Sequence, residues 1–159
     1  MIEQGGLKDL LEYSPETGLF HWLISQGNQK AGNVAGTNDH GYALVKINGK
    51  KYKAHRLAWL YMTGSFPKDC IDHVNGVTGD NRFSNLREAT NSQNQYNKGT
   101  GKHNLLGVKG VRKTKIGRYE ARATLSKNTL CLGTYDTAEE ASRAYQEFAK
   151  KHHGEFYHG

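Results

Sequence analysis

Cysteine, proline and long apolar runs are all scarce in this sequence. The two cysteines, Cys70 and Cys131, stand far apart with no Cys-x-x-Cys pair, which excludes a four-cysteine zinc site and a disulfide framework. The longest uninterrupted apolar run is Leu57–Met62, much shorter than the roughly 20 residues that cross a bilayer. The first residues also lack the basic and apolar regions of a secretory signal. We therefore expect a cytoplasmic protein in a reducing compartment, with no membrane partner.

Acidic residues are in the minority, and the positive charge is unevenly distributed. The 159 residues include 22 Lys and Arg against 15 Asp and Glu, which gives a net charge of +7. Residues 1–98 contain 11 basic and 9 acidic side chains, whereas residues 99–159 contain 11 and 6. Within Lys98–Lys127 there are nine basic residues and a single acid, Glu120. This density indicates a surface for a polyanion such as nucleic acid, although an ordinary solvated basic face explains the charge equally well.

The first 98 residues contain the signals of several short elements. Asn48-Gly49 is the strongest hairpin signal, because both central positions of a type I′ turn need a positive φ. Thr90 and Gln93 form a capping box, which predicts a helix over about 91–98. The expected elements are a helix near 7–13, a strand at 19–23, a hairpin of 41–47 with 51–54, a helix over 55–62, strands at 70–73 and 83–87, and the capped helix.

A Gly-rich, basic stretch at 99–104 is the best candidate for a linker between domains at 1–98 and 105–159. After it, the sequence predicts strands at 107–112, 118–125 and 129–132, followed by a helix with a capping box at Thr137 and Glu140. The middle strand alternates polar and apolar residues, so one face should be basic and the other should pack on the helix. The polar set is Arg118, Glu120, Arg122 and Thr124, and the apolar set is Tyr119, Ala121, Ala123 and Leu125.

Residues suited to phosphodiester chemistry gather between positions 72 and 94. Asp72 and His73 are adjacent near the end of a predicted strand, and Asn85 and Asn94 follow. Adjacent strand residues point to opposite faces, so a kink or bulge is needed to bring Asp72 and His73 to one site. Histidine supplies a base near neutral pH, and oxygen ligands such as Asp72 and Asn94 suit a divalent cation that offsets phosphate charge.

Two segments in this region resemble HNH endonucleases of the homing type: Ile71-Asp72-His73-Val74-Asn75-Gly76 and Asp80-Asn81-Arg82-Phe83-Ser84-Asn85-Leu86-Arg87. Gly41-Tyr42 and Ala54-His55-Arg56-Leu57-Ala58 are similar to the same family. The resemblance covers about residues 13–98 and implies a ββα-metal (His-Me finger) fold. It implies that His73 deprotonates a water, that Asp72 and Asn94 hold one divalent cation, and that Asn85 orients the histidine.

The expected cofactor is Mg²⁺ or Mn²⁺. Asp72 and Asn94 offer only oxygen, and such hard ligands suit these cations. Members of the wider group with histidine in place of Asn94 favour softer metals, so zinc is disfavoured here. For His55, contact with phosphate and pairing with a carboxylate remain equally open.

The C-terminal part, about residues 105–157, resembles the AP2 DNA-binding domain. The similar segments are Val108-Lys109-Gly110-Val111-Arg112, Gly117-Arg118-Tyr119-Glu120-Ala121-Arg122, the stretch from Leu132 to Ala141, and Ala144-Tyr145. The resemblance implies a three-stranded antiparallel sheet packed on one helix, with the open face of the sheet in the major groove of DNA. The expected DNA contacts are Arg56, Arg87, Lys109, Arg112, Lys113, Lys115, Arg118, Arg122 and Thr134.

Together these features predict an α+β protein with two domains, a metal-dependent DNA endonuclease whose C-terminal domain positions it on double-stranded DNA. The main alternative is a DNA-binding regulator on a non-catalytic nuclease scaffold, and a second is an RNA-binding structural protein. The presence of Asp72, His73, Asn85 and Asn94 favours the enzyme. No obligatory protein partner is evident, and a phage or mobile-element origin with action in a bacterial host fits the resemblance.

Overall fold

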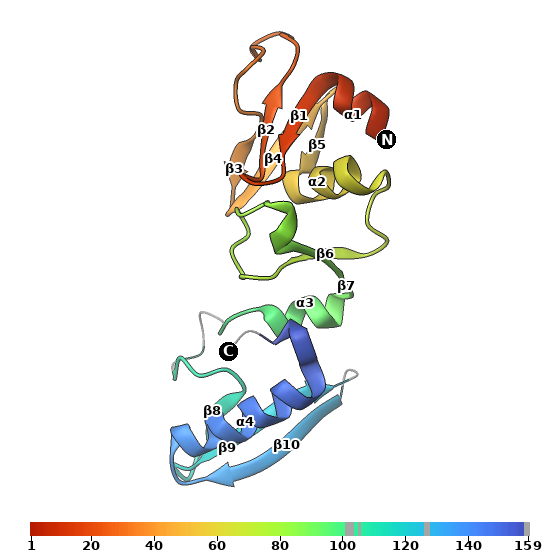
Figure 1. Ribbon diagram of the computed structural model, residues 1–159. Helices are drawn as coiled ribbons and strands as arrows, with labels where there is room; N and C mark the ends of the chain where they lie inside the picture. The colour runs from red at the N-terminus through yellow and green to blue at the C-terminus, as the bar shows by residue number, and fades with distance from the viewer. Residues whose placement is uncertain (101–103, 105, 126–127, 158–159) are drawn as a thin grey trace. The chain divides into compact units, whose positions relative to one another are not determined.

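The computed structural model describes residues 1–100, 104, 106–125 and 128–157 (Figure 1). The predicted mixture of helices and small sheets is present. The chain separates into two compact units, Met1–Asn91 and Ser92–Gly159. The predicted linker at 99–104 lies further along the chain, and residues 101–103 of it fall outside the described residues. Within the described ranges, no helix is long and apolar enough to cross a membrane.

The first unit begins with helix α1 (Gln4–Leu10) and a hairpin of β1 (Leu11–Ser14) with β2 (Leu19–Trp22). The sequence had predicted a helix up to Tyr13, and this prediction is wrong. Leu11 and Tyr13 are buried on either side of exposed Glu12, the alternation of a strand that covers a core on one face. Gly18 in the turn has a φ of 75°, and a Cβ there would stand 2.5 Å from the backbone of Asn81 and Arg82.

A second sheet follows, with β4 (Tyr42–Ile47) in its centre between β3 (Thr37–Asp39) and β5 (Lys50–Lys53). The turn at Asn48 and Gly49 has positive φ angles of 48° and 80°, so the predicted hairpin is confirmed. Helix α2 (Ala54–Thr63) starts directly after β5 and ends at Gly64, whose φ is 85°.

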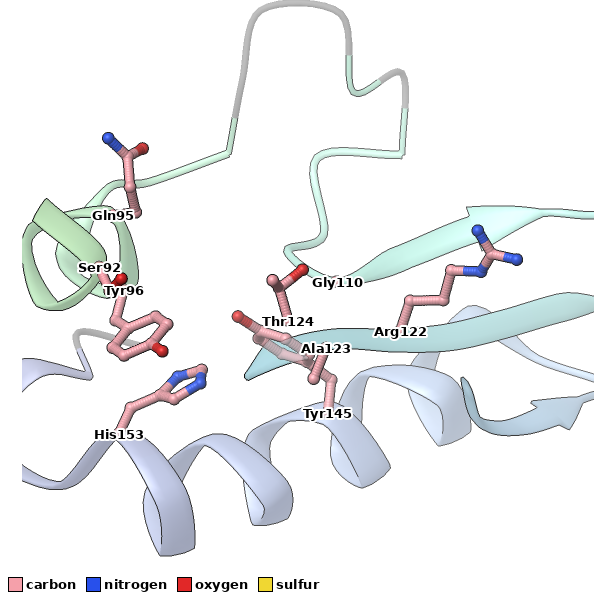
Figure 2. A pocket seen from close by; sticks show the side chains of 9 residues that line it. All are labelled: Ser92, Gln95, Tyr96, Gly110, Arg122, Ala123, Thr124, Tyr145 and His153. Carbon is pink, nitrogen blue, oxygen red and sulfur yellow. The ribbon is translucent and has the colours of Figure 1, made fainter. Parts of the chain in front are cut away.

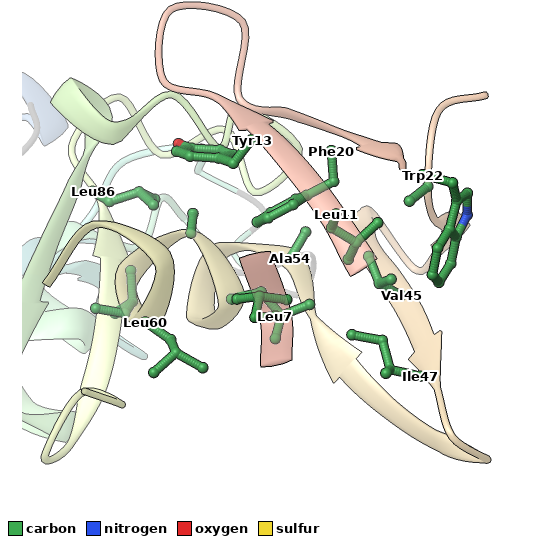
Figure 3. Packing of buried hydrophobic residues seen from close by; sticks show 14 residues of the cluster. Leu7, Leu11, Tyr13, Phe20, Trp22, Val45, Ile47, Ala54, Leu60 and Leu86 are labelled. Carbon is green, nitrogen blue, oxygen red and sulfur yellow. The ribbon is translucent and has the colours of Figure 1, made fainter. Parts of the chain in front are cut away.

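A two-stranded sheet of β6 (Cys70–His73) and β7 (Leu86–Ala89) completes this unit. A short 3₁₀ turn, η1 (Phe83–Asn85), leads into β7. The core of the unit gathers residues from all of these elements except β3, whose residues are exposed (Figure 3). Its largest fully buried side chains are Phe20, Leu7, Leu11, Leu57 and Val45.

Helix α3 (Asn91–Asn97) leads into the second unit, which contains β8 (Val111–Lys113), β9 (Tyr119–Leu125), β10 (Asn128–Tyr135), α4 (Ala138–His153) and the 3₁₀ turn η2 (Gly154–Phe156). The three strands form an antiparallel sheet with β9 in the centre. Ala121 and Ala123 of β9 are buried with Ala141 and Tyr145 of α4, so the alternation expected for this strand is present. Thr137 and Glu140 form the predicted capping box of α4.

Candidate active site

The pairing of β6 with β7 places Asp72 and His73. Asp72 lies opposite Arg87 and His73 lies opposite Leu86, in an uninterrupted register. Successive side chains therefore leave opposite faces of the strand, and both are buried, with 2% of Asp72 and 5% of His73 exposed. The sequence predicts a kink or bulge that would bring Asp72 and His73 to one site, but the pairing of β6 with β7 contains no bulge. The chain instead turns directly after the strand, where the Gly76 amide donates to the His73 carbonyl at 2.8 Å.

Asp72 forms a buried ion pair with Arg87. Nε and Nη2 of Arg87 donate to Oδ2 of Asp72 at 2.9 and 2.8 Å. Only 3% of the Asp72 side chain and 16% of the Arg87 side chain are exposed. The two residues meet because they are directly opposite each other across the sheet. Arg87, expected to contact DNA, is thus held against the carboxylate of an expected catalytic residue.

The His73 ring contacts the side chain of Asn81 and two neighbouring aromatic rings. Its Nε2 lies 3.2 Å from Oδ1 of Asn81, which is itself buried. The ring of His55 stands nearly perpendicular to it, with centroids 5.1 Å apart, and Tyr42 lies 6.4 Å away. Burial lowers the pKa of His73, and the bond to Asn81 and the charge of Asp72 oppose this only in part. The ring is therefore neutral at pH 7, as a general base must be.

The side chain of Asn85 forms hydrogen bonds with the loop between β6 and β7. Its Oδ1 accepts from the backbone amide of Asn75 at 3.0 Å, and its Nδ2 donates to the side chain of Asn75 at 3.0 Å and to the backbone carbonyl of Asp80 at 2.8 Å. Asp80 in turn accepts from Asn75 and Arg82. The hydrogen bonds from Arg82 hold the pKa of Asp80 well below its usual range. Asn85 thus stabilises the loop that carries Asn81.

The structure adds His55, Tyr42 and Asn81 to the residues expected from the sequence. His55 is 6% exposed and lies beside His73 and Tyr42, and burial lowers its pKa to about 3. Lys53 lies over the ring of Tyr42, with its Nζ atom 4.3 Å from the ring centroid. His55 and Tyr42 belong to segments whose similarity to HNH endonucleases was visible in the sequence. Asn81 also belongs to a segment with this similarity, but the sequence assigned it no role, because it is one of several polar residues there.

The two expected metal ligands belong to different units of the chain. Asp72 belongs to the first unit, whereas Asn94 is half-buried on α3 in the second. In the described part of the chain, no group of three or more His, Cys, Asp or Glu side chains is suited to holding a metal ion. A set of one carboxylate and one amide still fits a hard cation, because Mg²⁺ keeps several waters and takes phosphate oxygens as further ligands.

Comparison with known proteins found a match to one protein family. Residues 52–96 match the family model described as HNH endonuclease. This segment is an HNH endonuclease domain. It contains all four expected catalytic residues, together with His55 and Asn81.

A relative resembles a longer part of the chain. An uncharacterized HNH endonuclease of Acanthamoeba polyphaga mimivirus is 34% identical over 118 residues, which cover 73% of this chain and 60% of the relative. The chain thus spans less than two thirds of the length of this relative. Because Met1–Asn91 is shorter than the matched stretch, the similarity extends beyond the first unit. No solved structure matches the chain.

The open face of the second unit's sheet has an acid at the centre of its basic residues. Arg112 Nε donates to Glu120 Oε2 at 2.7 Å, and Arg122 Nε donates to Oε1 at 2.9 Å. Glu120 is 8% exposed, and the bonds from Arg122, Arg112 and Cys131 lower its pKa to about 2. The carboxylate therefore stays ionised and holds both guanidinium groups on the sheet.

The other expected DNA contacts differ in how they are held. Arg118 pairs with Asp136 at 2.8 Å, and Lys113 lies 5.9 Å from the ring centroid of Tyr119. Lys109 donates to the backbone carbonyl of Tyr96 at 2.5 Å, and burial lowers its pKa. Lys115 and Thr134 are exposed.

Arg56, on α2 of the HNH domain, is held by backbone. It donates to the carbonyl of Asp69 at 2.9 Å and to that of Pro67 at 3.4 Å. Its guanidinium group therefore fastens the loop that follows α2. Of the nine expected DNA contacts, Arg56 and Lys109 thus donate to backbone carbonyls, and Arg87 pairs with a buried carboxylate.

A cavity of about 440 Å³ lies within the second unit, beside the end of β9 (Figure 2). Tyr96 and His153 form one wall, stacked with ring centroids 3.8 Å apart, and Tyr145 lies on the other side. His153 is 6% exposed, and neither of its ring nitrogens has a hydrogen-bond partner among the described residues. Burial lowers the pKa of His153, while the nearby backbone of Thr124 acts in the opposite direction. This histidine is therefore neutral at pH 7.

Proposed function

We propose that this protein is a metal-dependent DNA endonuclease of the homing HNH type, guided by an AP2-like C-terminal domain. The observation that carries the proposal is the neutral, buried His73 beside Asp72 within a segment that matches HNH endonucleases. A histidine in this state accepts a proton at neutral pH, which the hydrolysis of a phosphodiester requires. The similarity to a viral protein fits a mobile-element origin.

In the proposed reaction, His73 removes a proton from the attacking water. Asp72 and Asn94 would hold the cation, which offsets charge on the phosphate and on the leaving oxygen when it is bound. Arg87 orients the carboxylate of Asp72 through two charge-assisted hydrogen bonds. Asn85 supports the loop between β6 and β7.

The test of the metal is cleavage of supercoiled plasmid over a series of Mg²⁺ concentrations, with and without chelator. Asp72→Asn removes the only formal charge among the proposed ligands, so the Mg²⁺ requirement should rise sharply, and Asn94→Ala should raise it less. Identical titration curves for the wild type and Asp72→Asn would place the cation elsewhere. DNA binding without cleavage at any Mg²⁺ or Mn²⁺ concentration would favour the non-catalytic regulator.

The second part of the proposal assigns DNA recognition to the sheet face that carries Arg112, Arg118 and Arg122. It is supported by the excess of basic residues after position 98 and by the packing of the opposite face on α4. Each phosphate contact that is lost should reduce the slope of log K against log salt by about 0.9. Arg118→Ala and Arg122→Ala should be compared across several DNA sequences, since a base contact costs about 1 to 3 kcal/mol at one position only. Unchanged affinity and salt slope in the double variant would remove this face from DNA recognition.

A further inference from the structure

Glu120 occupies the middle of the basic face of the second unit's sheet. It lies directly opposite Arg112 in the pairing of β8 with β9, and Arg122 is two positions further along β9. The three side chains therefore leave the same face of the sheet. The carboxylate accepts from Nε of Arg112 at 2.7 Å on one oxygen and from Nε of Arg122 at 2.9 Å on the other. One acid thus holds two arginines side by side.

The bonds to Glu120 leave the ends of both arginines available. A guanidinium group has five N–H donors, and each bond to Glu120 uses the donor on Nε. The other four donors are on the two terminal nitrogens, which lie further from the backbone. The side chain of Arg112 is 57% exposed and that of Arg122 is 42% exposed, whereas only 10% of the Glu120 side chain is exposed. The bonded atoms therefore lie near the sheet, and the guanidinium ends are accessible to a ligand.

By its charge alone, an acid at this place is unfavourable for binding to DNA. Phosphates repel a carboxylate, so a face that only attracts the backbone of DNA would bind better without Glu120. An arginine that is held before binding loses less side-chain freedom when it meets a base. The arrangement therefore favours the reading of base edges over general attraction. Guanine is the base whose edge offers two acceptors, N7 and O6, to one guanidinium group.

From this arrangement we infer that Glu120 is the positioning residue of the DNA-reading face, which presents the terminal nitrogens of Arg112 and Arg122 to neighbouring base pairs. Successive base pairs are about 3.4 Å apart, and two guanidinium groups on one carboxylate are close enough to reach neighbours. The chemistry favours a guanine at each of the two positions. The inference rests on the proposed function, since it requires that this face binds double-stranded DNA. It adds that an acidic residue, and not a further cation, determines the sequence preference.

The restraint on the arginines can be tested on the full chain without DNA. In ¹⁵N-labelled protein, the Nε–H signals of Arg112 and Arg122 are assigned by their loss in Arg112→Lys and Arg122→Lys. Both hydrogens should exchange with water at least about tenfold more slowly than that of Arg143, an exposed arginine of α4, because a bonded hydrogen exchanges only when its bond opens. In Glu120→Ala both should exchange like Arg143. Equal exchange of the three groups in the wild type would overturn the inference.

The main test compares the affinities of the full chain for two kinds of duplex, in the presence of chelator to prevent metal-dependent cleavage. One is the duplex that the wild type selects from a random library, and the other is the random library itself. In Glu120→Gln the affinity for random duplex should stay the same or rise, because one negative charge is lost. The affinity for the selected duplex should fall, so that the ratio of the two affinities drops at least about fivefold, the lower end for one bidentate base contact.

Glu147→Gln is the matched control, because it removes the same charge from an exposed position of α4 and should leave this ratio unchanged. If Glu120→Gln does not fold, Glu120→Asp replaces it. The shorter side chain keeps the charge but no longer reaches both arginines, so the ratio should drop by the same amount while the affinity for random duplex is unchanged. A smaller drop of the ratio would overturn the inference. A wild type that selects no duplex with two neighbouring G·C base pairs would also overturn it.

The double variant Arg118→Ala with Arg122→Ala distinguishes failure of this inference from failure of the proposed function. If the double variant binds both kinds of duplex like the wild type, the face does not read DNA, and the proposed recognition fails together with the inference. If the double variant loses affinity while Glu120→Gln keeps the wild-type ratio, recognition by this face stands and only the role of Glu120 is wrong.

Discussion

At the scale of single residues, the candidate active site consists of buried polar groups that form hydrogen bonds with one another. Asp72, His73, Asn81 and Asn85 are each less than 9% exposed. Transfer of such groups from water is costly unless they are paired, so their partners are as informative as the groups themselves. The partner of Asp72 is Arg87, the partner of His73 is Asn81, and the partners of Asn85 lie in the loop of Asn75 and Asp80.

The ion pair of Asp72 with Arg87 should contribute much more to stability than the exposed pair of Asp80 with Arg82. Arg87→Gln removes the charge that pairs with the buried carboxylate of Asp72, and breaking a buried ion pair in this way costs about 3 to 5 kcal/mol. Arg82 is 50% exposed, so Arg82→Gln should cost less than about 1 kcal/mol. Urea unfolding followed by tryptophan fluorescence measures both, since Trp22 and Trp59 lie in the first unit. Equal losses of unfolding free energy in the two variants would show that the buried Asp72–Arg87 pair contributes no more to stability than the exposed pair.

The sequence singled out candidate site residues in the first unit but did not predict their contacts. Asp72 and His73 were found because they are adjacent and followed by Asn85 at a recognisable distance. The pairing of Asp72 with Arg87 depends on the register of β6 with β7, and the sequence does not state that register. The bond of Asn81 to His73 depends on Tyr13 and Gly18, which are more than 60 positions away. Such long-range contacts follow only from the folded chain.

At the scale of elements, local signals were reliable where one short segment determines its own conformation. The Asn48-Gly49 turn, the end of α2 at Gly64 and the capping box of α4 are of this kind. The extension of the first helix to Tyr13 was wrong because tertiary packing prevailed. Leu11 and Tyr13 pair with Trp22 and Phe20 and bury their side chains in the core, which a continued helix would not achieve.

At the contact of α3 with α4, the imidazole of His153 is buried and has no hydrogen-bond partner among the described residues. Its replacement by an apolar ring should therefore increase stability. His153→Phe keeps the stacking on Tyr96 and removes two unsatisfied nitrogen atoms. Leaving a buried polar group unsatisfied costs about 1 to 3 kcal/mol, so the variant should stabilise α4 by at least about 1 kcal/mol. Amide hydrogen exchange of α4 at pH 7 measures this gain, with the exposed His152→Gln as the control. Faster exchange in His153→Phe would show that the imidazole has a favourable partner.

At the scale of the whole molecule, charge separates the two units. Residues 1–98 have nearly balanced charge around the buried site, and most of the excess of basic residues follows them. In the proposed function, the basic sheet face of the second unit would supply the charge that attracts a polyanion.

The first unit should lose stability in acid because its buried histidines resist protonation. Burial lowers the pKa of His55 to about 3 and also lowers the pKa of His73. Below pH 6.5 the unfolded chain therefore binds protons that the folded chain does not, and stability falls as the pH falls towards 3. Each such histidine contributes a slope of up to about 1.4 kcal/mol per pH unit.

Urea unfolding at several pH values between 7.5 and 4.5, followed by tryptophan fluorescence, measures this dependence. His55→Phe should reduce the slope of unfolding free energy against pH by the contribution of one histidine, up to about 1.4 kcal/mol per pH unit. His40→Gln should leave this slope unchanged, because the His40 side chain is 96% exposed. A stability that is constant between pH 7.5 and 5 would contradict the buried, neutral state of His55 and His73.

The measurement that tests the central claim most directly compares wild-type protein with His73→Ala on supercoiled plasmid in Mg²⁺, with DNA binding measured on the same samples. The claim is that His73 is the base that activates water. We predict that binding is unchanged and that cleavage by His73→Ala falls by roughly 10² to 10⁴, the usual contribution of a positioned general base. Cleavage by purified His73→Ala at the wild-type rate would contradict the account.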